Sequence, residues 1–132
     1  MSETNHESLL QTFEAIPEQV NRNAHLVHRG RYFNALLKIS VGETPYLMQI
    51  REGHIAQVSR KMPLFQTSDL HISASDEAWS ALWEKFPKAG WHDIFALHKR
   101  GAMQIEGESQ VLFANLQYIK DVLNSPRLLA GV

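Results

Sequence analysis

The feature that most constrains the fold of this chain is an alternation of apolar and polar side chains through three successive segments. The segments cover residues 33–41, 46–51 and 55–58, and in each of them apolar residues occupy every second position. Successive side chains of an extended chain point to opposite faces, so the pattern predicts strands with one buried face. A turn separates the first two segments, and Glu52-Gly53 predicts a tight hairpin between the next two. We therefore expect three antiparallel strands.

Two further segments alternate in the same way. After a loop around Pro63, residues 69–74 predict a fourth strand, and residues 103–107 predict a short fifth strand that ends at Gly107. Between and around these strands the apolar residues recur at helical intervals. The helices are expected over residues 4–20, from the cap Ser75 through Phe86, from Trp91 to Arg100, and from the cap Ser109 to Ser125-Pro126.

The N-terminal region leaves more than one possibility open. Pro17 weakens the end of the first predicted helix, and residues 20–30 fit either a short helix or a loop. The strands and helices are segregated along the chain, which favours an α+β domain. We expect a five-stranded, mostly antiparallel sheet covered on one face by helices. One domain over residues 1–132 is predicted, with a helical region at 1–30 and a tail at 126–132.

Composition excludes several classes of protein. Thirteen basic and fourteen acidic side chains give a net charge of -1, which argues against a nucleic-acid partner and gives no support to an anionic membrane surface. Without cysteine there is no disulfide, thiol nucleophile or thiolate metal site. No apolar run has the length of a membrane span and the first residues do not resemble a secretory signal. These features predict a cytoplasmic protein.

Motifs for catalysis or cofactor binding are weak. His25 and His28 have helical ligand spacing, but no carboxylate completes a metal site, so no metal is expected. The isolated glycines form neither a P-loop nor a dinucleotide fingerprint, and no cofactor is predicted. The one acid-base alternative is a small enzyme or accessory subunit acting on a hydrophobic substrate, in which His92 or His98 is the base and Asp93 orients it.

The most distinctive cluster is aromatic. Within 17 residues the chain carries Trp79, Trp83, Phe86, Trp91 and Phe95. A plain aromatic core explains this spacing, and so does a cavity between helices and sheet, which flexible methionines such as those at positions 48 and 103 would suit. A third possibility is a surface for a partner chain. The residues alone do not decide among the three.

Three blocks of sequence resemble the sterol carrier protein type two family, the small sterol-binding domains. They are the hairpin at residues 46–53, the strand and Ser-Asp-Glu helix start at 69–79, and the helix, glycine and strand at 93–108. Their order and spacing agree with the family, and residues 33–41 lie where its first strand belongs. The chain departs from the family at Glu52, where aspartate is usual, in its first 30 residues, and in lacking a peroxisomal Ser-Lys-Leu-like ending.

This resemblance implies an apolar tunnel between helices and sheet that carries a fatty acid, acyl-CoA, sterol-like or quinone-precursor molecule, without catalytic residues. Candidates to hold a polar head are Arg51, Lys99 and Arg100. The C-terminal helix could also be a lid or form a homodimer. The residues expected to line the tunnel are Phe33, Leu37, Met48, Ile50, Ile72, Trp79, Trp83, Phe95, Met103, Ile105, Leu112 and Leu116.

Overall fold

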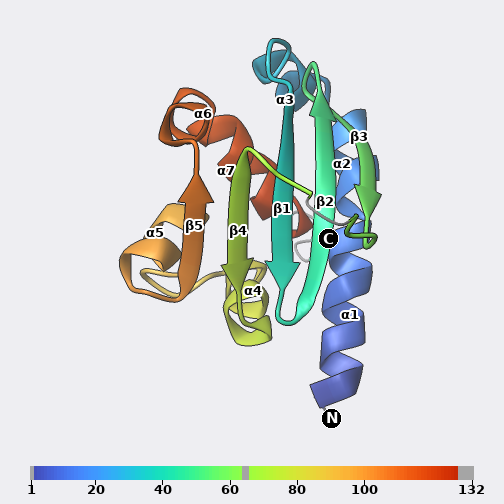
Figure 1. Cartoon of the computed structure of the whole chain (residues 1–132). Coiled ribbons are helices and arrows are strands. Elements are labelled where there is room, and N and C mark those ends of the chain that lie inside the picture. Colours follow the sequence, from blue (N-terminus) through green and yellow to red (C-terminus); the bar gives the residue numbers. More distant parts are fainter. Residues whose placement is uncertain (1, 64–65, 128–132) are drawn as a thin grey trace.

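The computed structural model describes residues 2–63 and 66–127 of the chain, as seven helices and five strands within those ranges (Figure 1). The helices are α1 (Ser2–Glu14), α2 (Ile16–Arg22), α3 (Ala24–Arg29), α4 (Asp76–Leu82), α5 (Ile94–Lys99), α6 (Ser109–Ala114) and α7 (Leu116–Asn124). The strands are β1 (Ala35–Val41), β2 (Thr44–Arg51), β3 (His54–Ser59), β4 (Leu70–Ala74) and β5 (Met103–Gly107).

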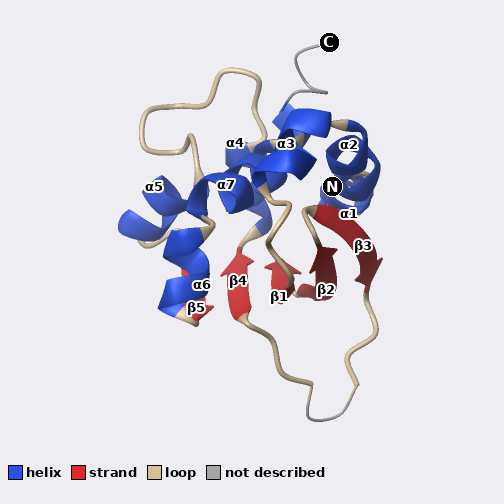
Figure 2. Cartoon of the chain, turned by 90° about the horizontal axis from the view of Figure 1, so that it is seen from above, coloured by secondary structure: helices blue, strands red, loops and turns tan. Residues whose placement is uncertain are grey.

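The five strands form one sheet in the order β3-β2-β1-β4-β5. The β1–β4 pair is parallel and the other pairs are antiparallel, so the predicted α+β class and the mostly antiparallel sheet are confirmed. Figure 2 shows α1–α4 and α7 on one side of the sheet, with α5 and α6 beside its β5 edge. The helices therefore cover one face, as expected.

The strand register explains which side chains enter the core. Leu37 of β1 lies opposite Met48 of β2 in the antiparallel pair and beside Leu70 of β4 in the parallel pair. All three side chains are at most 1% exposed. Because side chains alternate along a strand, every second residue of β1, β2 and β4 faces the helices. The period-two pattern of the sequence thus defines the face of the sheet that is buried.

The β2–β3 hairpin has the predicted two-residue turn. Glu52 and Gly53 have φ of 50° and 83°, the left-handed values that a type I′ turn requires at both positions. Gly53 is also in close contact with α3, because a Cβ atom added there would lie 2.3 Å from the Val27 carbonyl oxygen. Tyr118 of α7 donates a hydrogen bond of 2.6 Å to the Gly53 carbonyl. The hairpin is thereby fixed against two helices.

At the N-terminus, the predicted helix over residues 4–20 is two helices. They are separated at Ala15, and Pro17 lies in the first turn of α2, where its missing N–H has no helical acceptor. Of the two possibilities for residues 20–30, the structure has the helix: α3 is capped by Asn23, whose side chain accepts a hydrogen bond from the Leu26 N–H at 3.1 Å.

Helix boundaries in the aromatic region and after it differ from the prediction. The Ser75 cap is confirmed, since its hydroxyl accepts from the Ala78 N–H, but α4 ends at Leu82. The Leu82 carbonyl accepts hydrogen bonds from Arg127, at 2.5 and 3.1 Å, which the local sequence does not reveal. Phe86 lies beyond this end and its side chain is 80% exposed, so its assignment to the helix is wrong.

The two later predicted helices are also shorter in the structure than the sequence predicts. Helix α5 begins at Ile94 rather than Trp91, because the Asp93 side chain accepts from the Ala96 N–H at 2.8 Å and caps it there. The predicted C-terminal helix is broken at Asn115 into α6 and α7, and the residue at its N-cap position is Glu108 rather than Ser109.

Candidate functional site

The twelve residues predicted to line a tunnel separate into a buried group and a half-buried group. The buried ones are Phe33, Leu37, Met48, Ile50, Ile72, Trp79, Trp83, Met103 and Leu112, all at most 8% exposed. Phe95, Ile105 and Leu116 are half-buried and pack against the same core. None of the twelve lines any of the three hollows found among the described residues. The tunnel and its lining therefore remain a prediction.

The three half-buried residues share one location, the side of the molecule that carries β5. Phe95 belongs to α5, Ile105 to β5 and Leu116 to the start of α7. Helix α5 packs on β5, and α6 packs on α7. The Phe95 ring meets the Phe113 ring of α6 in an edge-to-face contact, with 6.0 Å between centroids. We call Phe95, Ile105, Phe113 and Leu116 the β5 cluster.

Phe113 is the member of the β5 cluster that the sequence analysis missed. Its side chain is 60% exposed although it follows Leu112, whose side chain is buried. The sequence does contain one signal for it: Phe113 is an aromatic residue that lies next to Leu112 but outside the apolar stripe of the predicted C-terminal helix. An exposed aromatic residue that continues a half-buried apolar layer extends that layer to the surface. The β5 cluster is thus where the described apolar core reaches solvent through aromatic side chains.

Local structure explains why the apolar layer is incomplete here. β5 is an edge strand, and its neighbours α5 and α6 have six residues each. Helices this short have little stability of their own and depend on tertiary contacts. Elements with few buried contacts open more readily than the centre of a sheet. The β5 cluster is therefore the part of the apolar layer best able to move.

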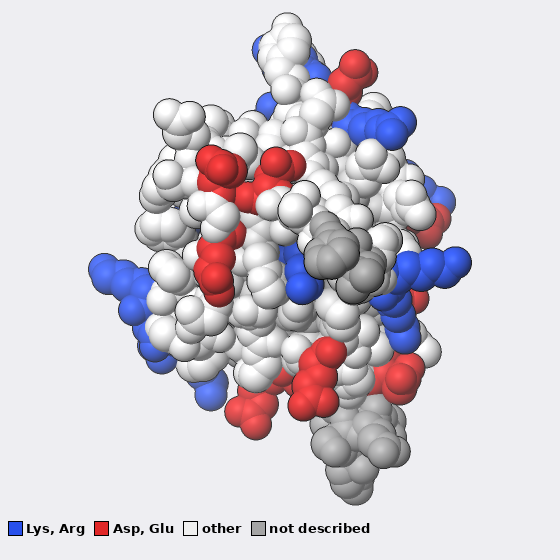
Figure 3. Space-filling model, viewed as in Figure 1, with Lys and Arg blue, Asp and Glu red and all other residues white. Residues whose placement is uncertain are grey.

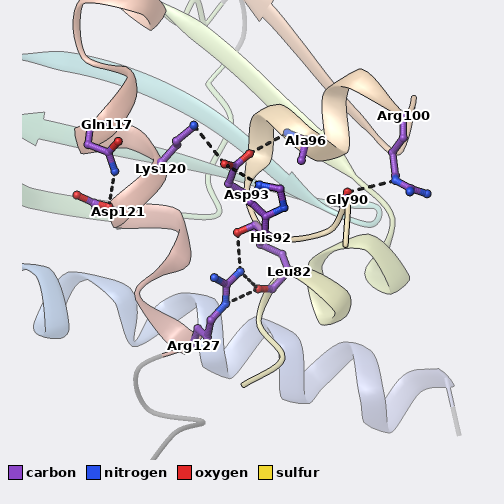
Figure 4. A network of polar contacts seen from close by, with 10 residues as sticks. All are labelled: Leu82, Gly90, His92, Asp93, Ala96, Arg100, Gln117, Lys120, Asp121 and Arg127. Atoms are coloured by element: carbon purple, nitrogen blue, oxygen red, sulfur yellow. Dashed lines mark hydrogen bonds and ion pairs between the residues drawn. The ribbon is translucent and has the colours of Figure 1, made fainter. Parts of the chain in front are cut away.

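The acid-base alternative depends on His92, His98 and Asp93, and their geometry does not favour it. Figure 4 shows the Asp93 carboxylate between the Ala96 N–H and the Lys120 ammonium, which lies 3.2 Å away. The His92 Nε2 atom is 3.6 Å from the same carboxylate, with 59% of its side chain exposed. The Asp93 carboxylate is thus occupied in capping α5 and in pairing α5 with α7.

The pKa of Asp93 agrees with this structural role. Burial raises the pKa of its carboxyl, but the hydrogen bond from Ala96 and the charges of Lys120 and His92 outweigh burial and hold the pKa below its usual value. His98 is exposed, and its Nδ1 lies 3.2 Å from the Met103 carbonyl oxygen. Neither histidine faces an enclosed apolar cavity, which a base acting on a hydrophobic substrate would require.

A hollow with several charged residues lies between α2, α3 and α7, away from the β5 cluster. Its volume is about 630 Å³, and Arg22, Arg29 and Arg127 line it together with acidic partners. The side-chain oxygens of Gln19 and Asn124 are buried without a hydrogen-bond partner among the described residues. The lining also includes apolar surface, so this hollow suits a molecule with both polar and apolar parts.

A second set of residues not found from the sequence lies at the opposite end of α1. His6 Nδ1 is 2.9 Å from a carboxylate oxygen of Asp76, and His6 Nε2 is 2.9 Å from the Thr44 hydroxyl. This resembles the order of a catalytic triad, but Glu7, Glu43 and Glu77 line the adjacent hollow. Carboxylates at that position would destabilise an oxyanion, so these contacts act as a clamp between α1, α4 and β2.

The three candidates for a polar head lie in two places. Lys99 and Arg100 are exposed at the end of α5, beside the β5 cluster, whereas Arg51 is exposed at the end of β2, three strands away in the sheet. The Arg100 guanidinium lies 4.6 Å from the Trp91 ring centroid and its Nε donates to the Gly90 carbonyl. Only the first two are placed to meet a group at the β5 cluster.

The described α7 uses its apolar stripe within its own chain. Tyr118, Ile119, Val122 and Leu123 are at most 2% exposed. A homodimer through this helix, which remains a prediction, would therefore require exchange of the helix. Among the described residues, no helix has both the length and the apolar character needed to cross a bilayer.

The architecture is that of the sterol carrier protein 2 fold, a mixed five-stranded sheet with helices on one face. The solved structure of a sterol carrier protein 2 has a TM-score of 0.69 at 13% identity, over 89% of this chain and 94% of its own. A possible sterol carrier protein from Thermus thermophilus has a TM-score of 0.67 at 13% identity, over 92% and 88% of the two chains.

A third structure with this fold is the UbiJ-SCP2 ubiquinone synthesis protein, with a TM-score of 0.60 at 15% identity over 90% of this chain and 95% of its own. No protein-family model matches the sequence, and no curated protein matches it. The resemblance carried by the three sequence blocks is confirmed at the level of the fold.

Proposed function

We propose that this protein binds and carries a lipid-like hydrophobic molecule between its helices and its sheet, and that the molecule enters through the β5 cluster. The ligand class comprises fatty acids, acyl-CoA, sterol-like molecules and quinone precursors. The observation that carries the proposal is the exposed Phe113 ring in contact with half-buried Phe95, at the β5 edge of the apolar layer.

Structures that share the fold support the ligand class. Proteins with this fold are called sterol carriers, and one is a ubiquinone synthesis protein. The comparison concerns the fold, so the choice among sterol, acyl chain and quinone precursor is a matter for experiment. Nothing in the geometry of His92, His98 or Asp93 favours an enzyme acting on such a ligand.

Binding in this way requires side chains of the β5 cluster to move outward. The ligand would displace the Phe95 and Phe113 rings outward and then lie along Ile105 and Met103, where the flexible methionine side chain adapts to an irregular guest. Burying about ten methylenes gains roughly 8 kcal/mol, from which an association cost of at least ~4 kcal/mol is subtracted. The remaining gain of about 4 kcal/mol or less corresponds to a millimolar affinity or weaker, and Lys99 or Arg100 would improve it for an acidic head.

The proposal is tested by titrating the purified full chain with a fluorescent fatty acid, a fluorescent sterol and a fluorescent acyl-CoA. We expect saturable binding of at least one probe, and a loss of at least about tenfold in affinity for Phe113→Asp, because a charge would then stand in an apolar path. Tyr32→Asp is the matched control, since Tyr32 is an aromatic residue 85% exposed elsewhere on the surface.

Two results would contradict the proposal. If no probe binds, and native mass spectrometry before and after organic extraction finds no apolar molecule leaving with the protein, the carrier function is wrong. If a probe binds equally well to wild type, Phe113→Asp and Tyr32→Asp, entry through the β5 cluster is wrong. Thermal melts of both variants check that the surface changes leave stability within about 0.5 kcal/mol.

A further inference from the structure

The segment between α4 and α5, residues 83–93, carries the second most exposed large apolar side chain among the described residues. Phe86 is 80% exposed, and the segment contains neither helix nor strand. Figure 2 shows the segment projecting beyond the helix layer, away from the sheet. We call residues 84–92 the α4–α5 loop. Phe86 contributes to neither the core nor the β5 cluster, whereas Trp91 of the same loop packs against the core.

One basic side chain lies against this aromatic residue, and three more are exposed in the same stretch of chain. The Lys85 ammonium lies 5.3 Å from the centroid of the Phe86 ring, and Lys88 is exposed two residues further along. Lys99 and Arg100 are exposed at the end of α5, and Arg100 is tied to the loop through the Gly90 carbonyl. The four cations therefore belong to one region of the surface.

The acidic residues of the same stretch do not cancel this charge. Between residues 84 and 101 there are four Lys or Arg and two acidic residues, a surplus of two positive charges in a chain whose net charge is -1. One of the acids, Asp93, is bound to Lys120 and to the Ala96 N–H, which leaves Glu84. Figure 3 shows Lys and Arg atoms along the edge of the molecule where α5 lies, with no Asp or Glu atoms among them.

We propose that the α4–α5 loop docks the protein on an anionic lipid bilayer, with the Phe86 ring inserted at the interface and Lys85 and Lys88 against acidic headgroups. A projecting aromatic side chain between mobile cations fits the boundary between headgroups and acyl chains. The near-neutral net charge of the whole chain gives no support to binding at an anionic membrane. At 0.1 M salt, however, attraction between charges acts within about 10 Å, so the local surplus of positive charge near the loop determines its attraction to acidic headgroups.

A bilayer fits this loop better than a partner protein does. A stable protein interface needs a broad complementary area with a buried anchor, on the order of 800 Å² on each partner. Here one aromatic ring stands among exposed charges, and the other exposed large apolar residues, Tyr32 and Phe113, belong to α3–β1 and to α6. The loop also continues directly into α5, which carries Phe95, so docking would bring the β5 cluster close to the membrane.

The inference deepens the proposed function by naming the surface where cargo would be exchanged, but its test needs no cargo. The full chain is mixed with vesicles of phosphatidylcholine alone or with 30 mol % phosphatidylglycerol, and binding is measured by flotation at low and high salt. We expect salt-sensitive binding to the anionic vesicles and weak binding to the neutral ones. Three variants then divide the contributions: Phe86→Ser, Lys85→Gln combined with Lys88→Gln, and the control Tyr32→Ser.

Phe86→Ser should weaken binding to anionic vesicles by about tenfold or more, because a phenyl ring no longer leaves water. The double lysine variant should weaken it by roughly fivefold for each charge removed and reduce the preference for phosphatidylglycerol accordingly. Tyr32→Ser should bind like wild type. This control is close, since Tyr32 is 85% exposed and the Arg31 guanidinium lies 4.7 Å from its ring centroid.

Failure of this inference and failure of the carrier function are distinguishable. If the wild-type chain binds neither vesicle, or if Phe86→Ser binds as tightly as wild type, membrane docking by this loop is wrong even where a fluorescent fatty acid binds normally. Loss of binding in the lysine variant alone would mean adsorption by charge without insertion, which also overturns the proposal.

Discussion

The β3 side and the β5 side of the sheet are built from the same alternating sequence pattern but are closed to different degrees. On the β3 side, the Asn21 side chain both accepts from the Ile55 N–H and donates to the Ile55 carbonyl, so α2 satisfies backbone groups of the edge strand β3. Tyr118 holds the Gly53 carbonyl, and Gly30 contacts Tyr118 so closely that a Cβ atom there would lie 2.4 Å from its ring.

On the β5 side, the edge strand meets short helices and half-buried apolar side chains. Ile105 of β5 stands in register with Ile72 of β4, yet Ile72 is 0% exposed and Ile105 is half-buried. The difference shows that burial across one sheet is set by what covers each strand as well as by the strand pattern. It also indicates where a guest molecule could enter at the smallest cost in free energy.

Two glycines with the same backbone conformation give one large expected difference between the two sides. Gly53 and Gly101 have nearly equal φ, 83° and 81°, but a Cβ atom at Gly101 meets nothing within 4 Å. We expect Gly101→Ala to cost roughly 1–2 kcal/mol of unfolding free energy for the left-handed backbone alone. Gly53→Ala should cost about 3 kcal/mol or more, because the clash with the Val27 carbonyl adds an overpacking cost.

Urea denaturation of the two variants measures this difference directly. Gly53 lies on the β3 side and Gly101 follows α5 on the β5 side, so each variant reports on one side of the molecule. Equal losses of unfolding free energy in the two variants would mean that the β3 side accommodates an added Cβ atom as easily as the β5 side. The proposed difference in packing between the two sides would then be wrong.

Truncating side chains gives a difference of similar size in the same direction. Met48 is 0% exposed, so Met48→Ala should cost about 2–5 kcal/mol of unfolding free energy. Ile105→Ala should cost about 1 kcal/mol, since part of that side chain is already in water. Thermal or urea unfolding checks both values, and a larger loss for Ile105→Ala would show that the β5 cluster is as firmly packed as the core.

Hydrogen exchange offers a third measure of the comparison. Amides of β1 and β2 should exchange only through global unfolding, whereas amides of α5 and α6 should exchange through local opening at a free energy lower by at least about 1–2 kcal/mol. A bound fatty acid should slow exchange in α5 and α6 and leave β1 nearly unchanged, because the ligand orders the β5 cluster. Uniform protection in the free protein would contradict the comparison.

Much of this fold could be predicted from the sequence because its strong signals are local. The alternation through residues 33–58 and the Glu52-Gly53 turn determine the antiparallel β1–β3 unit. Ser75 placed the start of α4, since a cap acts within one helical turn. What could not be predicted depends on distant partners. The end of α4 at Leu82 depends on Arg127, which follows it by 45 positions.

The candidate site was harder to predict than the fold, for a related reason. Apolar periodicity identifies residues that face the helices, but it does not distinguish a filled core from a lined cavity, because both need the same side chains. The sequence therefore predicts the same role, lining a tunnel, for Met48 and Phe95. In the structure Met48 is buried and Phe95 is half-buried. The roles proposed for Phe86 and Phe113 rest on the exposure of their side chains. That exposure depends on where the neighbouring helices end, which the local sequence does not determine.

The smallest predicted effect concerns the ion pair that fastens the β5 side to α7. Because the pKa of Asp93 is lowered in the folded chain, its carboxylate stabilises the fold above the unfolded pKa, near 3.8, and this contribution is lost as the pH falls through the folded value. Asp93→Asn keeps an oxygen for the Ala96 N–H but removes the charge beside Lys120, so we expect a loss of about 0.5–1 kcal/mol of unfolding free energy at pH 7.

This loss of stability should decrease on acidification until Asp93→Asn and the wild type unfold alike below the folded pKa of Asp93. Urea titrations between pH 7 and pH 3 measure this convergence, with Asp121→Asn as a control at the exposed Arg29 pair. A difference that persists unchanged at pH 3 would mean that the carboxylate charge does not hold α5 against α7, and that the β5 side is fastened by its apolar contacts alone.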